Sequence, residues 1–170
     1  MAAEAQLESI YDEHAQALFS LLMSVTHSEA DTRDVLQELF VRLARRPGLL
    51  HGVRNQRAFL LRIGHNLALD QMRRRVTQVR NSAALAAETD PGFAVSDDPD
   101  QKLFGQALAN ALGELPTKQR VVIHLKLWEG LTFEEIAAAL SLSTNTAASR
   151  FRYGLDKLRA RLRPLYEEIN

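Results

Sequence analysis

The stretch FLLRIGHNLALDQMRRR, residues Phe59–Arg75, predicts the amphipathic helix around which the N-terminal half of the chain is organised. At about 100° per residue, its large apolar side chains share one broad arc. The other side carries a line that mixes cations, an amide and one apolar group. The arc comprises Phe59, Leu60, Ile63 and Leu67, and the line comprises Arg62, Asn66, Leu69 and Arg73.

Three consecutive arginines, Arg73, Arg74 and Arg75, end this stretch. Cations near the C-terminus of a helix are stabilised by ~0.3–1 kcal/mol each, so a purely structural explanation exists. Three arginines exceed that need, and beside the neutral amide of Asn66 they suggest a surface for phosphates and bases. This helix in isolation leaves both interpretations open.

Two helices are predicted before this one, at residues 4–26 and 29–46, with Ser28 as the N-cap of the second. Each carries an apolar stripe at helical spacing. The second also has a polar face, which a solvated surface with a Glu38–Arg42 ion pair would explain. The stripes are Leu7, Ile10, Tyr11, Leu18, Leu21, Leu22 and Val25, then Leu36, Leu39, Phe40 and Leu43; the polar face is Asp34, Gln37, Glu38, Val41 and Arg45.

Residues 81–100 differ in composition from the segments on either side. They contain two prolines, a glycine and several acids, which predicts a mobile linker at a domain boundary. Helices are predicted beyond it at residues 101–112 and 118–128, the second capped by Thr117. The first of these is expected to bury Leu103, Phe104, Ala107, Leu108 and Ala111.

The C-terminal segment has the pattern of a helix-turn-helix. Thr132 and Glu135 form a capping box that opens a short helix, and a long helix follows at residues 144–163. A helical hairpin that serves only protein contact remains an alternative. The long helix should bury Ala147, Phe151, Leu155, Leu158 and Leu162 and expose Asn145, Ser149, Arg152, Tyr153 and Asp156, with Arg150 at the edge.

Composition places the chain among ordinary globular proteins, with 170 residues, 46% of them apolar and 25% charged. The absence of cysteine excludes disulfides and thiolate metal sites, and it fits a reducing cytoplasm. The first residues lack a basic segment followed by an apolar one, so no signal peptide is expected. No apolar run approaches the ~18 residues that a membrane span needs.

Charge is segregated along the chain, although the net charge is zero. Residues 1–38 carry net −7, residues 39–80 net +9, residues 81–116 net −5 and residues 117–170 net +3. Two basic segments therefore alternate with two acidic ones. This pattern fits a protein that touches a polyanion in two places and a basic partner elsewhere.

Nothing in the sequence favours an enzyme. Its five histidines are not at metal-ligand spacing, and there is no glycine-rich phosphate loop and no pair of carboxylates in a cleft-like context. We therefore predict no catalytic residue, no metal site and no cofactor.

Three segments in this order resemble one protein family: DVLQELFVRLARR from Asp34, AFLLRIGHNLALDQMRRR from Ala58, and LGELPTKQRVVIHLKLWEGLTFEEIAAALSLSTNTAASRFRYGLDKLR from Leu112. Together with the acidic linker they resemble bacterial RNA polymerase sigma factors of the extracytoplasmic-function (ECF) group in the sigma-70 family. The resemblance implies an all-α fold of two small domains. Residues 1–80 would be a three-helix region 2 domain, residues 81–100 a flexible acidic linker and residues 101–170 a region 4 helix-turn-helix domain.

The resemblance also implies roles for individual residues. The DxxQExF pattern would dock on the clamp helices of the polymerase β′ subunit. The strip on the third helix, with the loop Gly48–Gln56, would bind the −10 promoter element, and the last helix would read the −35 element. The implied docking residues are Asp34, Gln37, Glu38 and Phe40; those for −10 DNA are Arg54, Arg62, Asn66, Arg73, Arg74 and Arg75; those for −35 DNA are Thr144, Asn145, Thr146, Ser149, Arg150, Arg152 and Tyr153.

The resemblance implies three partners in the cytoplasm, namely core RNA polymerase with its β and β′ subunits, promoter DNA and an anti-sigma factor, with no membrane insertion. The sequence departs from the family where Leu60 replaces a frequent tryptophan and where Ala148 and Tyr153 replace frequent basic residues. Asp156 adds a negative charge lower on the same helix. Two other functions remain open: a helix-turn-helix regulator that acts without polymerase, and a sigma-like adaptor that reads DNA weakly.

Overall fold

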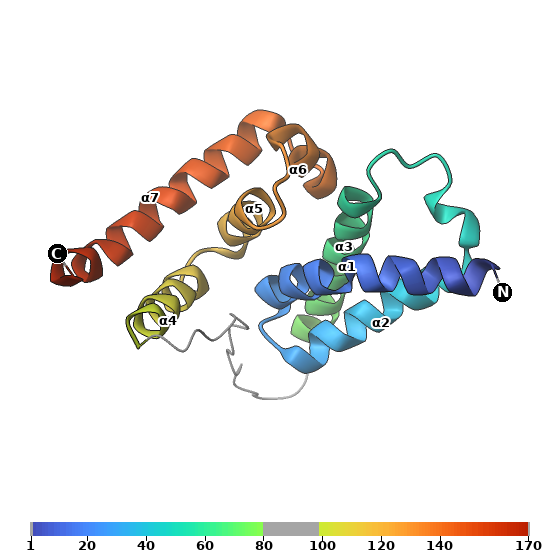
Figure 1. Ribbon diagram of the computed structural model, residues 1–170, viewed down its shortest axis with the longest axis horizontal. Helices are drawn as coiled ribbons and strands as arrows, with labels where there is room; N and C mark the ends of the chain where they lie inside the picture. Colours follow the sequence, from blue (N-terminus) through green and yellow to red (C-terminus); the bar gives the residue numbers. More distant parts are fainter. Residues whose placement is uncertain (1, 80–98, 170) are drawn as a thin grey trace. The chain divides into compact units, whose positions relative to one another are not determined.

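The computed structural model describes residues 2–79 and 99–169 and divides the chain into two compact units, Met1–Asp90 and Pro91–Asn170 (Figure 1). Every regular element in the described residues is helical, so the all-α prediction is confirmed there. Unit 1 contains α1 (Ala2–Thr26), α2 (Glu29–Arg45), the 3-10 helix η1 (Pro47–Leu50) and α3 (Gln56–Val79). Unit 2 contains α4 (Pro99–Gly113), α5 (Thr117–Leu127), α6 (Phe133–Leu140) and α7 (Thr144–Ile169).

In unit 1, α1, α2 and α3 each pack against the other two. Helix α3 comes close to both partners at Gly64, where an added Cβ would lie 3.4 Å from side-chain carbons of Leu18, Leu22 and Leu39. Burial of apolar side chains between the helices supplies the main stabilising free energy. The side chains that are almost fully buried here are Leu18, Leu21, Leu22, Val35, Leu39, Leu60 and Leu61.

The corner between α1 and α2 is held by short-range polar contacts. His27 adopts a left-handed conformation (φ 55°), which turns the chain out of α1. The backbone N–H of Asp31 donates to Ser28 Oγ at 3.3 Å, so the predicted N-cap is confirmed. In the same corner, the buried hydroxyl groups of Thr26 and Thr32 lie 2.7 Å apart.

In unit 2, α4 and α5 are joined by a turn that is organised around a buried arginine. Arg120 is only 6% exposed, and its Nη1 donates to the backbone carbonyl oxygens of Leu112, Gly113 and Leu115 at 3.2, 2.9 and 3.2 Å. Its Nη2 donates to Thr117 Oγ1 at 3.1 Å. Burial lowers the pKa of this guanidinium, which nevertheless stays charged because an arginine titrates far above neutrality. Arg120 thereby satisfies the free carbonyl groups at the C-terminal end of α4.

Helices α6 and α7 form the predicted helix-turn-helix. Thr132 Oγ1 accepts from the backbone N–H of Glu135 at 3.2 Å, and Glu135 Oε2 accepts from the backbone N–H of Thr132 at 2.8 Å. The capping box is therefore confirmed. Ser141 ends α6 in a left-handed conformation. Ser143 Oγ then accepts from the backbone N–H of Thr146 at 3.1 Å and caps α7, a role that the sequence analysis did not assign.

Two expectations about side chains in the C-terminal half are corrected: the burial of Leu103 and Phe104, and the capping role of Thr117. Leu103 and Phe104 are 58% and 42% exposed, because the buried cluster around Leu112 and Leu158 reaches only the later turns of α4. Thr117 does not cap α5, since the N-cap position is Pro116 and the Thr117 hydroxyl instead accepts from Arg120.

Two boundaries also differ. Helix α4 begins at Pro99, within the segment predicted as linker, since proline suits the first turn of a helix. Helix α7 continues past Arg163 to Ile169 with Pro164 inside it, so the loss of one N–H donor does not end the helix. The prediction of a mobile linker falls mainly on residues 80–98, which lie outside the described residues.

The Arg120→Lys variant should destabilise unit 2. A lysine ammonium keeps the charge, but its one nitrogen cannot be both at the Nη1 position beside the three carbonyl oxygens and at the Nη2 position beside Thr117 Oγ1. Charged hydrogen bonds contribute about 1.5–3 kcal/mol each. We expect a loss of about 2–3 kcal/mol in the free energy of unfolding. The single tryptophan, Trp128, lies in unit 2, so urea unfolding followed by its fluorescence measures this unit.

The matched control is Arg159→Lys, which changes an exposed arginine that pairs at 3.7 Å with Asp156. We expect that variant to unfold within about 0.5 kcal/mol of the unsubstituted protein. Equal urea midpoints for the two variants would contradict the role given to Arg120.

Candidate protein- and nucleic-acid-binding surfaces

Helix α2 presents an acidic face to solvent because its apolar face is buried against α1 and α3. Asp34, Gln37 and Glu38 are exposed, as the sequence analysis predicted. Arg42 Nε donates to Glu38 Oε1 at 2.8 Å, with both side chains 52% exposed. The intrahelical ion pair of the solvated-face interpretation is therefore present, and it leaves Asp34 and Gln37 accessible beside it.

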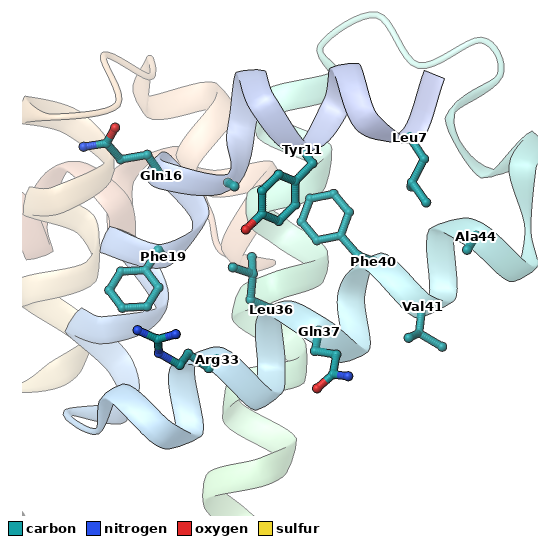
Figure 2. Close-up of a pocket in the computed structure, with 11 residues that line it drawn as sticks. Leu7, Tyr11, Gln16, Phe19, Arg33, Leu36, Gln37, Phe40, Val41 and Ala44 are labelled. Atoms are coloured by element: carbon teal, nitrogen blue, oxygen red, sulfur yellow. The ribbon is translucent and has the colours of Figure 1, made fainter. Parts of the chain in front are cut away.

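An open groove of about 700 Å³ runs between α1 and α2 next to this face (Figure 2). Its centre is formed by Tyr11 and Phe40, whose ring centroids lie 5.0 Å apart at 59°. Phe19 and Arg33 lie toward one end of the groove, and Leu7 lies toward the other. The walls are mainly apolar, so the groove can accept apolar side chains of a protein partner.

Three residues assigned to buried stripes line this groove and are only partly covered. Tyr11 is 50% exposed, and Leu7 and Phe40 are half-buried, because the groove between α1 and α2 leaves this edge of the two helices open. Gln37 also lines the groove, which makes the groove continuous with the acidic face. The groove could not be predicted from the sequence, because an apolar stripe on a helix does not show how wide a sector of the helix its neighbours cover.

Helix α3 exposes the predicted polar strip. Arg62, Asn66 and Arg73 are exposed and Leu69 is half-buried. The guanidinium of Arg62 lies 5.8 Å from the ring centroid of Phe59. This strip combines cations with an amide along one side of a helix, which suits contact with phosphates and base edges.

Arg54 lies in the turn that leads into α3. Gly52 adopts φ 75°, a left-handed conformation that glycine accepts without steric cost. Asn55 Oδ1 accepts from the backbone N–H of Ala58 at 2.9 Å and caps the start of α3. Arg54, between these two residues, is exposed.

The three consecutive arginines point in different directions. Arg73 is 76% exposed and lies 3.5 Å from Asp70 of the same helix. Arg74 is exposed. Arg75 reaches across to α2, where its Nη1 forms an ion pair with Asp31. Of the three arginines predicted as one DNA-binding group, Arg73 and Arg74 are therefore exposed to solvent, whereas Arg75 contacts another helix.

His65 lies beside Asn66, with its Nδ1 buried and without a hydrogen-bond partner in the described part of the chain. Burial lowers the pKa of the imidazole, and a side-chain hydrogen bond with Asn66 opposes that shift only in part. The ring is therefore neutral at pH 7.

Helix α7 exposes only part of its predicted reading face. Asn145, Arg152, Tyr153 and Thr144 are exposed, and the Arg152 guanidinium lies 5.1 Å from the Tyr153 ring centroid. The residues that are half-buried, because α7 packs against α5 and α6, are Thr146, Ala148, Ser149 and Arg150. The Thr146 hydroxyl lies 2.8 Å from Ser143 Oγ, within the helix cap.

Comparisons with known proteins show to which family the chain belongs. Residues 10–77 match the model for Sigma-70 region 2, and residues 105–158 match the model for Sigma-70, region 4. The ECF RNA polymerase sigma factor SigL of Mycobacterium tuberculosis is 30% identical over 167 residues, which span 96% of this chain and 93% of SigL. The chain belongs to the ECF RNA polymerase sigma factors.

Two further relatives match over most of their length. The ECF RNA polymerase sigma factor SigX of Bacillus subtilis is 27% identical over 176 residues, with 98% of this sigma factor and 88% of SigX covered. The RNA polymerase sigma factor CarQ of Myxococcus xanthus is 30% identical over 170 residues, with 98% and 95% covered.

Solved structures show the same fold. The sigma factor RpoE in complex with the anti-sigma factor NepR, from Bartonella quintana, superposes with a TM-score of 0.79 at 23% identity, covering 93% of this chain and 97% of that one. CnrH in complex with the cytosolic domain of CnrY superposes with a TM-score of 0.64 at 26% identity, covering 95% and 90%.

As a sigma factor, the protein binds core RNA polymerase and directs promoter-specific initiation of transcription. Its region 2 match lies in unit 1 and its region 4 match in unit 2. Among the residues that the structure describes, no helix is both long and apolar enough to span a bilayer. The same residues contain no group of three or more acidic or histidine side chains placed to hold a metal ion.

The sigma factor should lose stability in mild acid through His65. Its pKa in the folded state lies below the ordinary value of 6.5, so the unfolded chain binds the proton more tightly. The contribution of the buried, neutral His65 to the free energy of unfolding is fully present above about pH 6.5 and is lost as the pH falls below that value. Urea midpoints measured between pH 7.5 and 5 should fall less steeply for His65→Gln than for the unsubstituted protein.

His51→Gln is the control, because it removes an exposed histidine from the loop before α3. Its pH profile should follow that of the unsubstituted sigma factor. If the His65→Gln profile also follows that of the unsubstituted sigma factor, burial of His65 does not cause the pH dependence of stability.

Proposed function

We propose that the two units divide the work of initiation. Residues 1–80 dock on core polymerase and recognise and melt the −10 element, residues 81–100 connect the units, and residues 101–170 contact the −35 element. The observation that carries this assignment is the pair of opposed surfaces in unit 1, an acidic face on α2 and a basic, amide-bearing strip on α3. The protein would act in the cytoplasm as a binding factor and not as an enzyme.

The docking surface would be the acidic face of α2 together with the adjoining groove. Asp34 and Glu38 supply negative charge, which would attract basic side chains of the β′ clamp helices. Phe40 and Tyr11 supply apolar contact area in the groove. Such a surface fits a partner helix with a basic flank and an apolar ridge.

The −10 surface would be the α3 strip with the loop Gly48–Gln56. Extruding a base from the DNA stack costs a few kcal/mol, which contacts to the flipped base must offset. Asn66 offers an amide that can donate to and accept from a base edge, while Arg54, Arg62 and Arg73 offer cations for the flanking phosphates.

The −35 surface would be the exposed part of α7. The N-terminal residues of a recognition helix contact base edges in the major groove, which places Asn145 nearest to the bases. Arg152 and Tyr153 lie two turns further along the helix, where phosphate contact is favoured. Ser149 and Arg150 are half-buried and would act from the edge of the helix.

An anti-sigma factor would compete for these surfaces. The solved structures of RpoE and CnrH are complexes with NepR and with the cytosolic domain of CnrY. A partner of this kind that covers Asp34 and the Tyr11–Phe40 groove would exclude core polymerase by occupying the same contacts.

Reversing the charge at the docking face should weaken polymerase binding. Glu38→Arg turns an attractive contact with a basic helix into a repulsive one and also breaks the pair with Arg42. We expect at least about a tenfold loss of affinity for core polymerase, equal to about 1.4 kcal/mol, with the helical content unchanged. Fluorescence anisotropy of labelled sigma factor titrated with core enzyme measures the loss.

Glu13→Arg is the matched control, since it reverses an exposed acid on α1 that does not line the groove. Equal affinities for the two variants would show that the loss at Glu38 reflects net charge and not a docking contact.

The −10 element should dominate promoter choice. Asn66→Ala should abolish run-off transcription by the holoenzyme while leaving core affinity within about threefold, because Asn66 lies on the proposed DNA strip and outside the docking face. Arg150→Ala should give a milder loss that is largest at low salt and shrinks as salt rises, since removing a phosphate contact flattens the salt dependence by about one unit of slope. Run-off transcription on promoters with a scrambled −10 or −35 element ranks the two surfaces.

The ranking follows from charge, because residues 39–80 carry net +9 and residues 117–170 only net +3. A larger loss from scrambling −35 than from scrambling −10 would reverse it. If the protein binds core enzyme but directs no specific initiation on any promoter of a random library, this result would favour the interpretation as a sigma-like adaptor that reads DNA weakly.

A further inference from the structure

We propose that Arg75 is a positioning residue that ties α3 to α2 through Asp31, and not a phosphate ligand like its neighbours. The inference deepens the proposed function of unit 1 and rests on it. The tie would join the helix that carries the −10 strip to the first turn of the helix that carries the polymerase-docking face. The sequence resemblance placed all three consecutive arginines on DNA.

Asp31 is held by two side chains of α3. Arg75 Nη1 donates to Asp31 Oδ2, and Gln71 Nε2 donates to Asp31 Oδ1 at 3.4 Å. The Asp31 side chain is only 14% exposed, and a carboxylate removed from water to that degree requires a charged or hydrogen-bonding partner. Arg75 is the partner that supplies an opposite charge.

This pair differs from the other ion pairs of unit 1 that involve α2. Glu29–Arg33 and Glu38–Arg42 each lie within α2 at a spacing of four residues, with all four side chains more than half exposed. In the pair between α2 and α3, Arg75 is 49% exposed but Asp31 only 14%. Asp31 and Arg75 are 44 residues apart in the chain and join two helices. A pair of this kind constrains how the helices are oriented, whereas an exposed pair within one helix does not.

The contacts add to the apolar packing in holding the rotation of α3 about its own axis. Gln71 and Arg75 are one helical turn apart, so both face α2 at Asp31. At about 100° per residue, Asn66 lies about 180° from Arg75 around the helix, and Arg73 lies about 160° from it. Holding Arg75 against α2 therefore directs Asn66 and Arg73 away from α2.

The two roles for Arg75 make opposite predictions about Asp31. If Arg75 binds phosphate, Asp31 competes with DNA for the same guanidinium, and removing its charge should leave DNA binding unchanged or strengthen it. If Arg75 positions α3, loss of Asp31 should weaken DNA binding as much as loss of Arg75 does. Asp31→Asn and Arg75→Gln are nearly isosteric changes that separate these outcomes.

The decisive experiment measures holoenzyme affinity for a forked promoter DNA with a single-stranded −10 element. We expect Asp31→Asn and Arg75→Gln to lose affinity by the same factor, about three- to tenfold. Asp31→Asn binding as tightly as the unsubstituted protein, or more tightly, would overturn the proposal. Glu29→Gln is the matched control, because it removes an exposed ion pair from the same first turn of α2, and it should bind normally.

A charge swap provides a second test. The double variant Asp31→Arg with Arg75→Asp restores an ion pair between the helices but places an acid at position 75. We expect it to bind the forked DNA more tightly than Arg75→Gln, since the tie is present again. A phosphate-ligand role predicts the reverse order, because an acid would face the DNA backbone.

Hydrogen exchange in the free protein tests the tie without polymerase or DNA. Amide exchange at residues 72–78 should speed up equally in Asp31→Asn and Arg75→Gln and should stay unchanged in Glu29→Gln. Unchanged exchange in all three variants would overturn the proposal. The unsubstituted holoenzyme must also prefer the −10 fork over a scrambled fork; if it does not, the proposed function of unit 1 fails, whereas the hydrogen-exchange result stands alone.

Discussion

Burial of one side of α3 between α1 and α2 is the constraint on which the rest of unit 1 depends. Leu60 and Leu61 are almost fully enclosed, and Gly64 lets the backbone of α3 come close to both partners. A helix held along one side must present the other side to solvent, which is where Arg62 and Asn66 lie. The packing that stabilises the bundle thus also directs the surface assigned to promoter DNA.

Arginines in this sigma factor serve two physical purposes, and their number alone does not separate the two. Arg120 is buried and holds three carbonyl oxygens, and Arg75 holds a nearly buried carboxylate on another helix. The planar fork of a guanidinium suits both arrangements, because it donates several hydrogen bonds in fixed directions. Arg62 and Arg73 remain in solvent, where long-range attraction to phosphates operates.

The surfaces proposed for the partners of this sigma factor are helix faces and an open groove, and not an enclosed cavity. Tyr11 and Phe40 form the centre of the groove, with the acidic residues of α2 beside it. Apolar area contributes affinity, while charge at the rim contributes rate and selectivity of association. One continuous surface therefore offers both contributions to a protein partner.

Local sequence predicted the presence of the helices, the Ser28 cap and the Thr132–Glu135 capping box, because these depend on contacts within about four residues. It also determined the exposed strip of α3 and the acidic face of α2, since helical period sets which residues share a side. Packing between helices settled three outcomes that local sequence did not predict: Leu103 is exposed, Arg120 caps α4 and Arg75 faces Asp31. Those outcomes depend on where other helices end and how closely they pack, which no local pattern specifies.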